Sequence, residues 1–442
     1  MLALRLTRGS HPAVQLRRLL VALASAGTGF LLLCTLGYAM GHPDSPAAAA
    51  LRLGWCATPM AATVYFAVAV ARTDPATKPR PGLSAIGLGP GRLMAISATT
   101  TALACALGSM LALLFFLHLR GDLTGMPFDG AAAEFLASDQ PLPLPAALTL
   151  LALVPVIASL AVALVLRPRD IRPASEKRPA RSYGRFGAQG RPDARETFGA
   201  YGRFGAHLRG GGRRSATEDE PTSDTTPAPD PDPSRPAAPR EAPRGLPWGI
   251  AVLAAGLAGE AYANRAKDGG GLSLPGGLAD GPASVLIGWV LTAIGLALAG
   301  PGLTHLCGRL LQSVSPGALR LLAGRVLMEE ATRIGRPLGV VCAVASGGFA
   351  MTALYDADAP AFGPLTTLGG LLVTGCTVAT LLTAALEAKH ARADTTAALL
   401  RLGAPATMLR SAAALRAGAL LALFLPLTLF VAELAALPLA DR

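Results

Sequence analysis

The sequence has few charged residues and few aromatic ones for its length. Of its 442 residues, Asp, Glu, Lys and Arg make up 15% and aromatic residues 5%, whereas about a quarter of the residues in soluble proteins are charged. Apolar residues reach 52%. They lie in blocks of about 20, the length that spans a bilayer core as a helix. This pattern excludes a single soluble globular enzyme and predicts an all-α polytopic membrane protein.

The sequence also lacks the motifs that carry most enzymatic chemistry. It has no G-x-x-x-x-G-K-[ST] phosphate-binding loop, no H-E-x-x-H zinc motif and no C-x-x-C pair. The six cysteines lie in the apolar blocks, and the six histidines are scattered, mostly near the ends of these blocks. Such placement is typical of buried or interfacial side chains and not of metal ligands. We therefore predict no catalytic site, no cofactor and no metal site in this chain.

Nine segments are long and apolar enough to be predicted spans. The charged residues Glu260, Arg416 and Glu433 fall within them, but near their ends. A long side chain can reach the interface from such a position, so we expect these residues to snorkel and not to form a proton relay. The predicted spans are Leu16–Met40, Leu51–Ala71, Leu93–Leu117, Leu144–Leu166, Leu246–Ala263, Ala283–Leu303, Leu338–Tyr355, Gly363–Leu386 and Ala412–Leu434.

Lys and Arg residues are distributed unevenly between the two ends of these spans. With the N-terminus in the cytoplasm, 34 of the 39 basic residues fall on cytoplasmic segments, which is the bias that membrane proteins follow. We therefore predict a multi-pass plasma-membrane protein with a cytoplasmic N-terminus and an extracellular C-terminus. The net charge of +11 then requires no nucleic-acid partner, because anionic lipid headgroups favour basic cytoplasmic loops.

Residues 168–245 differ in composition from the rest of the chain. They are rich in Pro, Gly, Arg and Asp and have almost no aliphatic core. Such a segment cannot bury enough apolar surface to offset the loss of chain entropy on folding. The sequence therefore predicts a disordered cytoplasmic linker with four spans before it and five after it.

A short pattern occurs twice, each time on the predicted cytoplasmic side and directly before a span that returns outward. Ala-Arg-x-Asp at 71–74 and at 391–394 is followed by Leu-x-x-aliphatic-Gly-x-x-x-x-x-Leu. We expect each segment to form an elbow, a short amphipathic piece that is broken at a glycine and fused to the next span. The glycine allows positive φ or a close backbone approach at that point. A helix C-cap followed by an interfacial helix would fit the same pattern. The elbow residues are Leu83, Ile86, Gly87 and Arg92 in the first copy and Leu399, Arg401, Leu402, Gly403 and Arg410 in the second.

The second elbow, Leu-Leu-Arg-Leu-Gly-Ala-Pro-Ala-Thr-Met-Leu-Arg at 399–410, resembles the FtsX/MacB-type permease domain of ABC transporters. In that family such an elbow precedes the third helix of a four-helix module. The resemblance implies a first module at 1–167, the linker at 168–245, a connecting transmembrane hairpin at 246–304 and a second module of three helices at 305–442. The missing fourth helix, the long linker and the lack of large outer domains depart from the family pattern, so the chain resembles a degenerate, duplicated member.

This resemblance implies a permease-like subunit that couples a separate cytoplasmic ABC ATPase to the movement of an amphiphile such as a lipid or a peptide. The two elbows would receive the ATPase, membrane lipid would surround the spans, and any ATPase activity would belong to the partner. Whether the chain forms a homo-oligomer or a hetero-oligomer is left open.

Other functions remain as alternatives. The missing helix and the small outer loops also fit a non-transporting scaffold or regulator that is built on the permease fold and recruits partners through the linker. A secondary transporter is disfavoured, because no charged residue is evident near the middle of a predicted span. An intramembrane enzyme ranks last, because the sequence has no catalytic constellation.

Overall fold

The structure is a computed structural model of the whole chain. Almost all of the predicted linker, and the first elbow up to residue 88, lie outside the residues that the structure describes. The described residues are 12–74, 89–123, 130–133, 135–167, 243, 245–265, 272–274, 278–281, 283–313, 317–354 and 363–440.

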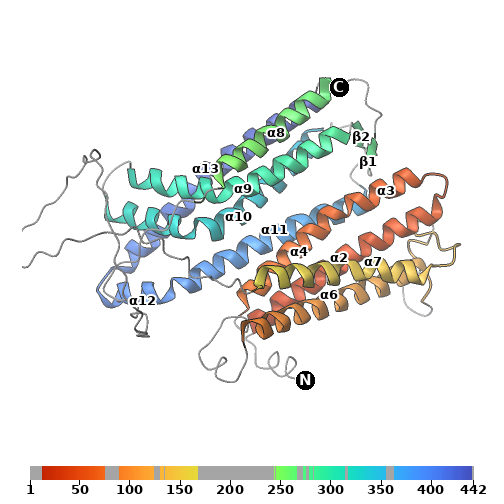
Figure 1. Cartoon of the computed structure of the whole chain (residues 1–442), viewed down its shortest axis with the longest axis horizontal. Coiled ribbons are helices and arrows are strands. Elements are labelled where there is room, and N and C mark those ends of the chain that lie inside the picture. Colours follow the sequence, from red (N-terminus) through yellow and green to blue (C-terminus); the bar gives the residue numbers. More distant parts are fainter. Residues whose placement is uncertain are drawn as a thin grey trace, which may run out of the picture. The chain divides into compact units, whose positions relative to one another are not determined.

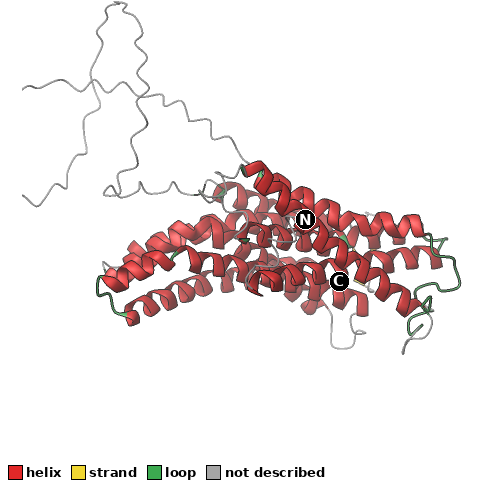
Figure 2. Ribbon diagram, turned by 90° about the horizontal axis from the view of Figure 1, so that it is seen from below, coloured by secondary structure: helices red, strands yellow, loops and turns green. Residues whose placement is uncertain are grey.

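Helices make up nearly all of the described part of the chain (Figure 2). One short antiparallel ribbon, which the sequence did not predict, pairs Leu272 with Gly281 and Leu274 with Leu278. The elements in chain order are α2 (Pro12–Gly41), α3 (Pro46–Trp55), α4 (Ala57–Thr73), α6 (Pro90–Arg120), α7 (Leu144–Leu166), α8 (Leu246–Arg265), β1 (Leu272–Leu274), β2 (Leu278–Gly281), α9 (Ala283–Ser313), α10 (Ala318–Leu354), α11 (Pro364–Ala391), α12 (Ala393–Arg401) and α13 (Ala406–Ala440).

The described helices are those of a multi-pass membrane protein. Seven segments are long and apolar enough to cross a bilayer, and α8 adds a shorter apolar stretch, Leu246–Tyr262. Eight of the nine predicted spans coincide with these segments, and the second is interrupted at Cys56 between α3 and α4. The seventh falls on α10, which is not one of the segments that meet the length and apolarity needed to cross a bilayer, and its last residue, Tyr355, lies outside the described residues. α10 is longer than its predicted span, because the charged segment before residue 338 continues into it as one helix.

Helices α2, α4, α6 and α7 pack side by side as the first group (Figure 1). The pattern along α7 explains its place in this group. Its buried side chains recur every three or four residues, so they form one helical face toward α2, α4 and α6. Large apolar side chains on other sides of α7, including Leu148 and Leu160, are more than half exposed, as lipid contact requires. The buried residues of α7 are Ala147, Leu151, Val154, Ala158 and Val162.

Helices α8, α9, α10 and α13 form the second group, in which glycines let backbones come unusually close. Gly288, Gly295 and Gly302 recur every seventh residue on the face of α9 toward α8. On the side of α9 toward α10, a Cβ at Gly300 would lie 2.1 Å from the carbonyl oxygen of Gly335. Small residues of this kind allow the van der Waals packing that holds membrane helices together.

α11 contacts both groups. It packs against α2 and α4 of the first group and against α10 of the second. The described elements therefore belong to one compact unit.

Arg52 and Arg120, the basic residues predicted on the outer side whose side chains the structure describes, both have partners. The guanidinium of Arg52 lies 3.5 Å from the centre of the Tyr38 ring, a cation–π contact. Arg120 is buried and donates from Nη2 to the carbonyl oxygens of Ala137 and Gln140. Arg120 thus holds the loop after α6 in place. This role explains why a basic residue occurs on the predicted outer side, where basic residues are otherwise few.

We predict that Gly300→Ala lowers the thermal unfolding midpoint. The new methyl group would meet the Gly335 carbonyl oxygen, which cannot rotate away as a side chain can. Overpacking costs about 1–3 kcal/mol, more than the roughly 0.5–1 kcal/mol that replacing a helical glycine by alanine contributes. A thiol-reactive fluorophore would follow unfolding in detergent, because all six cysteines are buried and free. Gly348→Ala is the control, with no atom within 4 Å of its Cβ. Equal loss of stability in the two variants would contradict the packing argument.

Candidate functional site

The second elbow is a separate short helix between two spans. A single residue, Arg392, separates α11 from α12, and the turn after α12 leads into α13. Gly403 has φ 87°, so of the two roles expected for this glycine the structure shows the positive φ. Its N–H donates to the Leu400 carbonyl at 3.1 Å, and the Ala404 N–H donates to the Leu399 carbonyl at 3.0 Å. This pair of bonds is the Schellman motif, so two backbone hydrogen bonds hold the conformation of the turn.

The second elbow lies almost wholly on the surface. α12 has no buried residue, and its only close neighbour among the described elements is α11. Leu399 is half-buried, whereas Arg401, Gly403 and Arg410 are exposed. Leu402 is 84% exposed. Leu400 is also exposed, at 47%, so two apolar side chains lie on the surface on either side of Arg401.

The first elbow is only partly described. Leu83, Ile86 and Gly87 lie outside the described residues. Arg92 is exposed in the first turn of α6, which begins after Gly89 with Pro90 as its first residue. Proline is favoured at this position because its missing N–H would have no helical partner.

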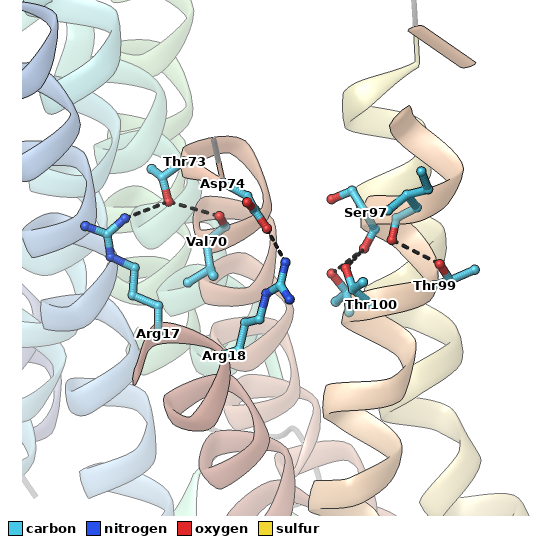
Figure 3. Close-up of polar contacts among 10 residues, drawn as sticks. Arg17, Arg18, Val70, Thr73, Asp74, Ser97, Thr99 and Thr100 are labelled. Atoms are coloured by element: carbon cyan, nitrogen blue, oxygen red, sulfur yellow. Dashed lines mark hydrogen bonds and ion pairs between the residues drawn. The ribbon is translucent and has the colours of Figure 1, made fainter. Parts of the chain in front are cut away.

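An ion pair joins the start of α2 to the end of α4. Arg18 Nη2 lies 2.5 Å from Asp74 Oδ2, and Arg17 Nη1 donates to Thr73 Oγ1 at 3.3 Å. Figure 3 shows both arginines extending from α2 toward the last residues of the first Ala-Arg-x-Asp segment. The cavity beside this pair, which Ser97 of α6 also lines, has a volume of about 20 Å³, so it has room for about one water and not for a substrate.

A second ion pair occupies the corresponding place beside the other Ala-Arg-x-Asp segment. Arg392 Nη1 lies 3.1 Å from Glu330 Oε2 of α10, and Arg333 Nε lies 3.9 Å from Glu387 Oε1 of α11. The two pairs differ in which helix carries which charge. In the first pair α2 supplies the basic residue, whereas in the second pair α10 supplies the acidic residue. Both pairs lie at the ends where α2, α6, α10 and α13 begin and α4 and α11 end, which we call the basic side.

Glu330 is the buried member of the second pair. Its side chain is 9% exposed, whereas that of Arg392 is 29% exposed. Burial raises the pKa of the Glu330 carboxyl above its ordinary value, although Arg392, Arg416 and Arg333 act against this rise. Arg416 of α13 belongs to the same cluster and has a buried Nη1 without a hydrogen-bond partner. Three helices, α10, α11 and α13, therefore bring their charges together directly beside the elbow.

The expected snorkelling of Glu260 is wrong. Glu260 is 0% exposed, between α8 and α9, and Thr292 Oγ1 donates to its Oε1 at 3.0 Å. Arg416 is half-buried beside Glu330, and Glu433 is exposed. The sequence shows that Glu260 lies near the end of a predicted span, but not which side of α8 it is on. Glu260 lies on the side that carries Gly249 and Gly256, and this side packs against α9, so the carboxyl is buried.

No group of three or more His, Cys, Asp or Glu side chains within the described segments could hold a metal ion. The ion pairs were not found from the sequence. The Ala-Arg-x-Asp repeat marked one member of each, but Arg18 and Glu330 lie on distant helices and carry no local signal.

No family model matches the chain, and neither a curated protein nor a solved structure is significantly similar to it. The resemblance to FtsX/MacB-type permeases therefore stays a prediction from the sequence.

We predict that Arg392→Gln destabilises the protein more at pH 8 than at pH 5. A carboxyl whose pKa is raised by folding contributes stability at low pH and loses it as pH rises through the raised value. Removing Arg392 takes away one of the three attractions that oppose the rise, so the ionised Glu330 carboxylate destabilises the folded state more than before. The loss should not exceed the roughly 1–3 kcal/mol typical of a buried group left without any partner, because Arg416 and Arg333 remain. Unfolding midpoints at the two pH values would measure the effect.

The matched control for this test is Glu330→Gln, which keeps the size of the side chain and removes its charge. In that background Arg392→Gln should lose its pH dependence, as a double-mutant cycle would report. A pH dependence that persists without the Glu330 carboxyl would assign the effect to another group.

Proposed function

We propose that the chain is a permease-like subunit of an ABC-type transporter in the plasma membrane, working with a separate cytoplasmic ATPase. The observation that supports this most strongly is the second elbow. It presents Leu402 and Arg401 on the surface of the basic side, and only one residue separates it from α11. In this proposal the ATPase binds the two elbows, and the permease moves an amphiphile such as a lipid or a peptide.

The second elbow is built to pass on a displacement. The Schellman turn at Gly403 and the fixed φ of Pro405 restrict the backbone between α12 and the start of α13 at Ala406. At the other end of the elbow, Arg392 is tied to Glu330 of α10. A push on α12 would therefore reach α13 through the turn and α10 through the ion pair.

We further propose that the chain contains two related modules, one of α2, α4, α6 and α7 and one of α10, α11 and α13. Two features support the relation. The first helix of each module packs on the second and the third, as α2 does on α4 and α6 and as α10 does on α11 and α13. The first and second helices of each are also joined by an ion pair at the basic side.

We predict that Leu402→Asp releases the ATPase. The experiment is affinity purification from native membranes in mild detergent, followed by mass spectrometry, with a stoichiometric P-loop ATPase expected for the natural sequence. Burial of a leucine side chain contributes about 1.5–3 kcal/mol, so losing it from the interface should weaken association roughly tenfold or more. The control is Ala397→Asp, which adds the same charge at an exposed position on another side of α12.

Two results would count against this function. Equal recovery of the ATPase with both variants would contradict docking at the elbow. Recovery of no ATPase, together with other partners that are lost when residues 168–245 are deleted, would favour the scaffold or regulator.

A further inference from the structure

A carboxyl group lies fully buried inside the hairpin of α8 and α9. Glu260 is 0% exposed and lies on the face of α8 that packs against α9. Its Cγ lies over Gly288, where an added Cβ would be 2.4 Å away. Any larger residue at Gly288 would therefore displace the Glu260 side chain, so the glycine makes the space that the carboxyl occupies.

The Glu260 carboxyl is only partly hydrogen-bonded. Thr292 donates to Oε1, whereas Oε2 is buried and has no partner among the described residues. Trp289, which lies between Gly288 and Thr292 in the sequence, has a buried indole N–H that also lacks a partner. One neutral donor is a poor replacement for the hydration of a carboxylate, and buried charges in proteins are normally paired or neutralised.

The other charged residue of α8, Arg265, is five residues from Glu260 and therefore starts from another side of the helix. No charged group on the neighbouring helices, as far as the structure describes them, is placed to neutralise Glu260. On α9 the nearest are His305 and Arg309, about 20 Å or more beyond Thr292 at roughly 1.5 Å per residue. On α13, Glu433 is exposed and would in any case repel a carboxylate.

α10 likewise offers no counter-charge. Its described charged residues precede the level at which Gly339 meets Leu296 of α9, so they lie toward the basic side. The titratable group of α10 nearest in level is Cys342, whose Sγ is directed at the Phe424 carbonyl of α13.

We propose that Glu260 binds a proton within the membrane and that the neutral acid keeps the α8–α9 hairpin closed. A protonated carboxyl carries no charge into this packing and gains an O–H donor at its unpartnered oxygen. Loss of the proton would leave an unpaired charge among glycines and apolar side chains, so ionisation would open the hairpin. Because Glu260 lies near the end of α8 at Arg265, the proton enters and leaves on the side opposite the basic side. The proton site uses no residue of the two elbows, so its existence does not require an ATPase.

Infrared difference spectroscopy of the purified protein in lipid bilayers tests directly whether Glu260 is protonated. The pH is 7.5, because exposed carboxyl groups are ionised at this value. The carbonyl stretch of a protonated carboxylic acid should be present and should disappear in Glu260→Gln, which keeps the size of the side chain and its acceptor for Thr292. Thr292→Val should move the band to higher frequency, because the carbonyl loses a donor. In the control, Glu433→Gln, the band should stay unchanged.

Opening of the hairpin is tested by fluorescence. The chain has three tryptophans. With Trp55 and Trp248 replaced by Phe, the emission of Trp289 should shift to the red as pH is raised and should stay constant in the same background carrying Glu260→Gln. Absence of the acid band, a band of the same intensity in Glu260→Gln, or the same pH response in both proteins would overturn the proposal. Stabilisation of the natural sequence by Na⁺ at pH 7.5 without the acid band would instead assign a metal cation to the site.

Discussion

The packing of α11 decides whether the membrane helices form one domain, because this helix contacts both groups. Its buried face is small and polar, made of Gly369, Cys376, Thr377, Thr380, Thr383, Ala384 and Ala388. The three threonines on it donate to carbonyl groups of α11 itself. Across to α4, the one side-chain polar contact described is between Thr63 and Cys376 Sγ, at 3.9 Å. Few hydrogen bonds therefore join α11 to α4. The two helices can shift relative to each other with a loss of van der Waals contacts and without breaking strong hydrogen bonds.

The same helix carries the charges that position the second elbow. Arg392 lies between α11 and α12 and pairs with Glu330, so a movement of the elbow acts on α11 and α10 together. The free energy lost on desolvating a buried ion pair is about as large as the free energy gained from the attraction between its charges. The raised pKa of Glu330 agrees with this balance. We therefore interpret this ion pair as a device that fixes the position of the elbow, and not as a main source of stability.

The sequence was most informative where the property is periodic or local. The ends of α7 are those of the predicted span, because a continuous apolar block can only be a buried or lipid-facing helix here. Gly403 could be placed in a turn because only glycine adopts its φ readily. Residues 83–87, and the coupling role of both elbows, stay predictions.

The failures of sequence reasoning have a common physical cause. The burial of Glu260 depends on which side of α8 faces the glycines of α9, and the partners of Asp74 and Arg392 come from helices far away in the sequence. Hydropathy along the chain records how deep a residue lies in the membrane. It does not record which neighbour the residue faces, and that is what decides whether a charge is solvated, paired or neutralised.

The two proposed sites lie at opposite ends of the helices, yet one helix connects them. α10 packs on α9 through the Gly300–Gly335 contact and holds Arg392 through Glu330. If ionisation of Glu260 separates α8 from α9, α9 loses a neighbour on one side while its backbone contact with α10 stays on the other. The resulting movement reaches α10 through glycine contacts that cannot yield by rotating side chains, and α10 carries it to the elbow. Protonation and partner binding would then bias the same set of helices, and by linkage each would change the affinity of the other.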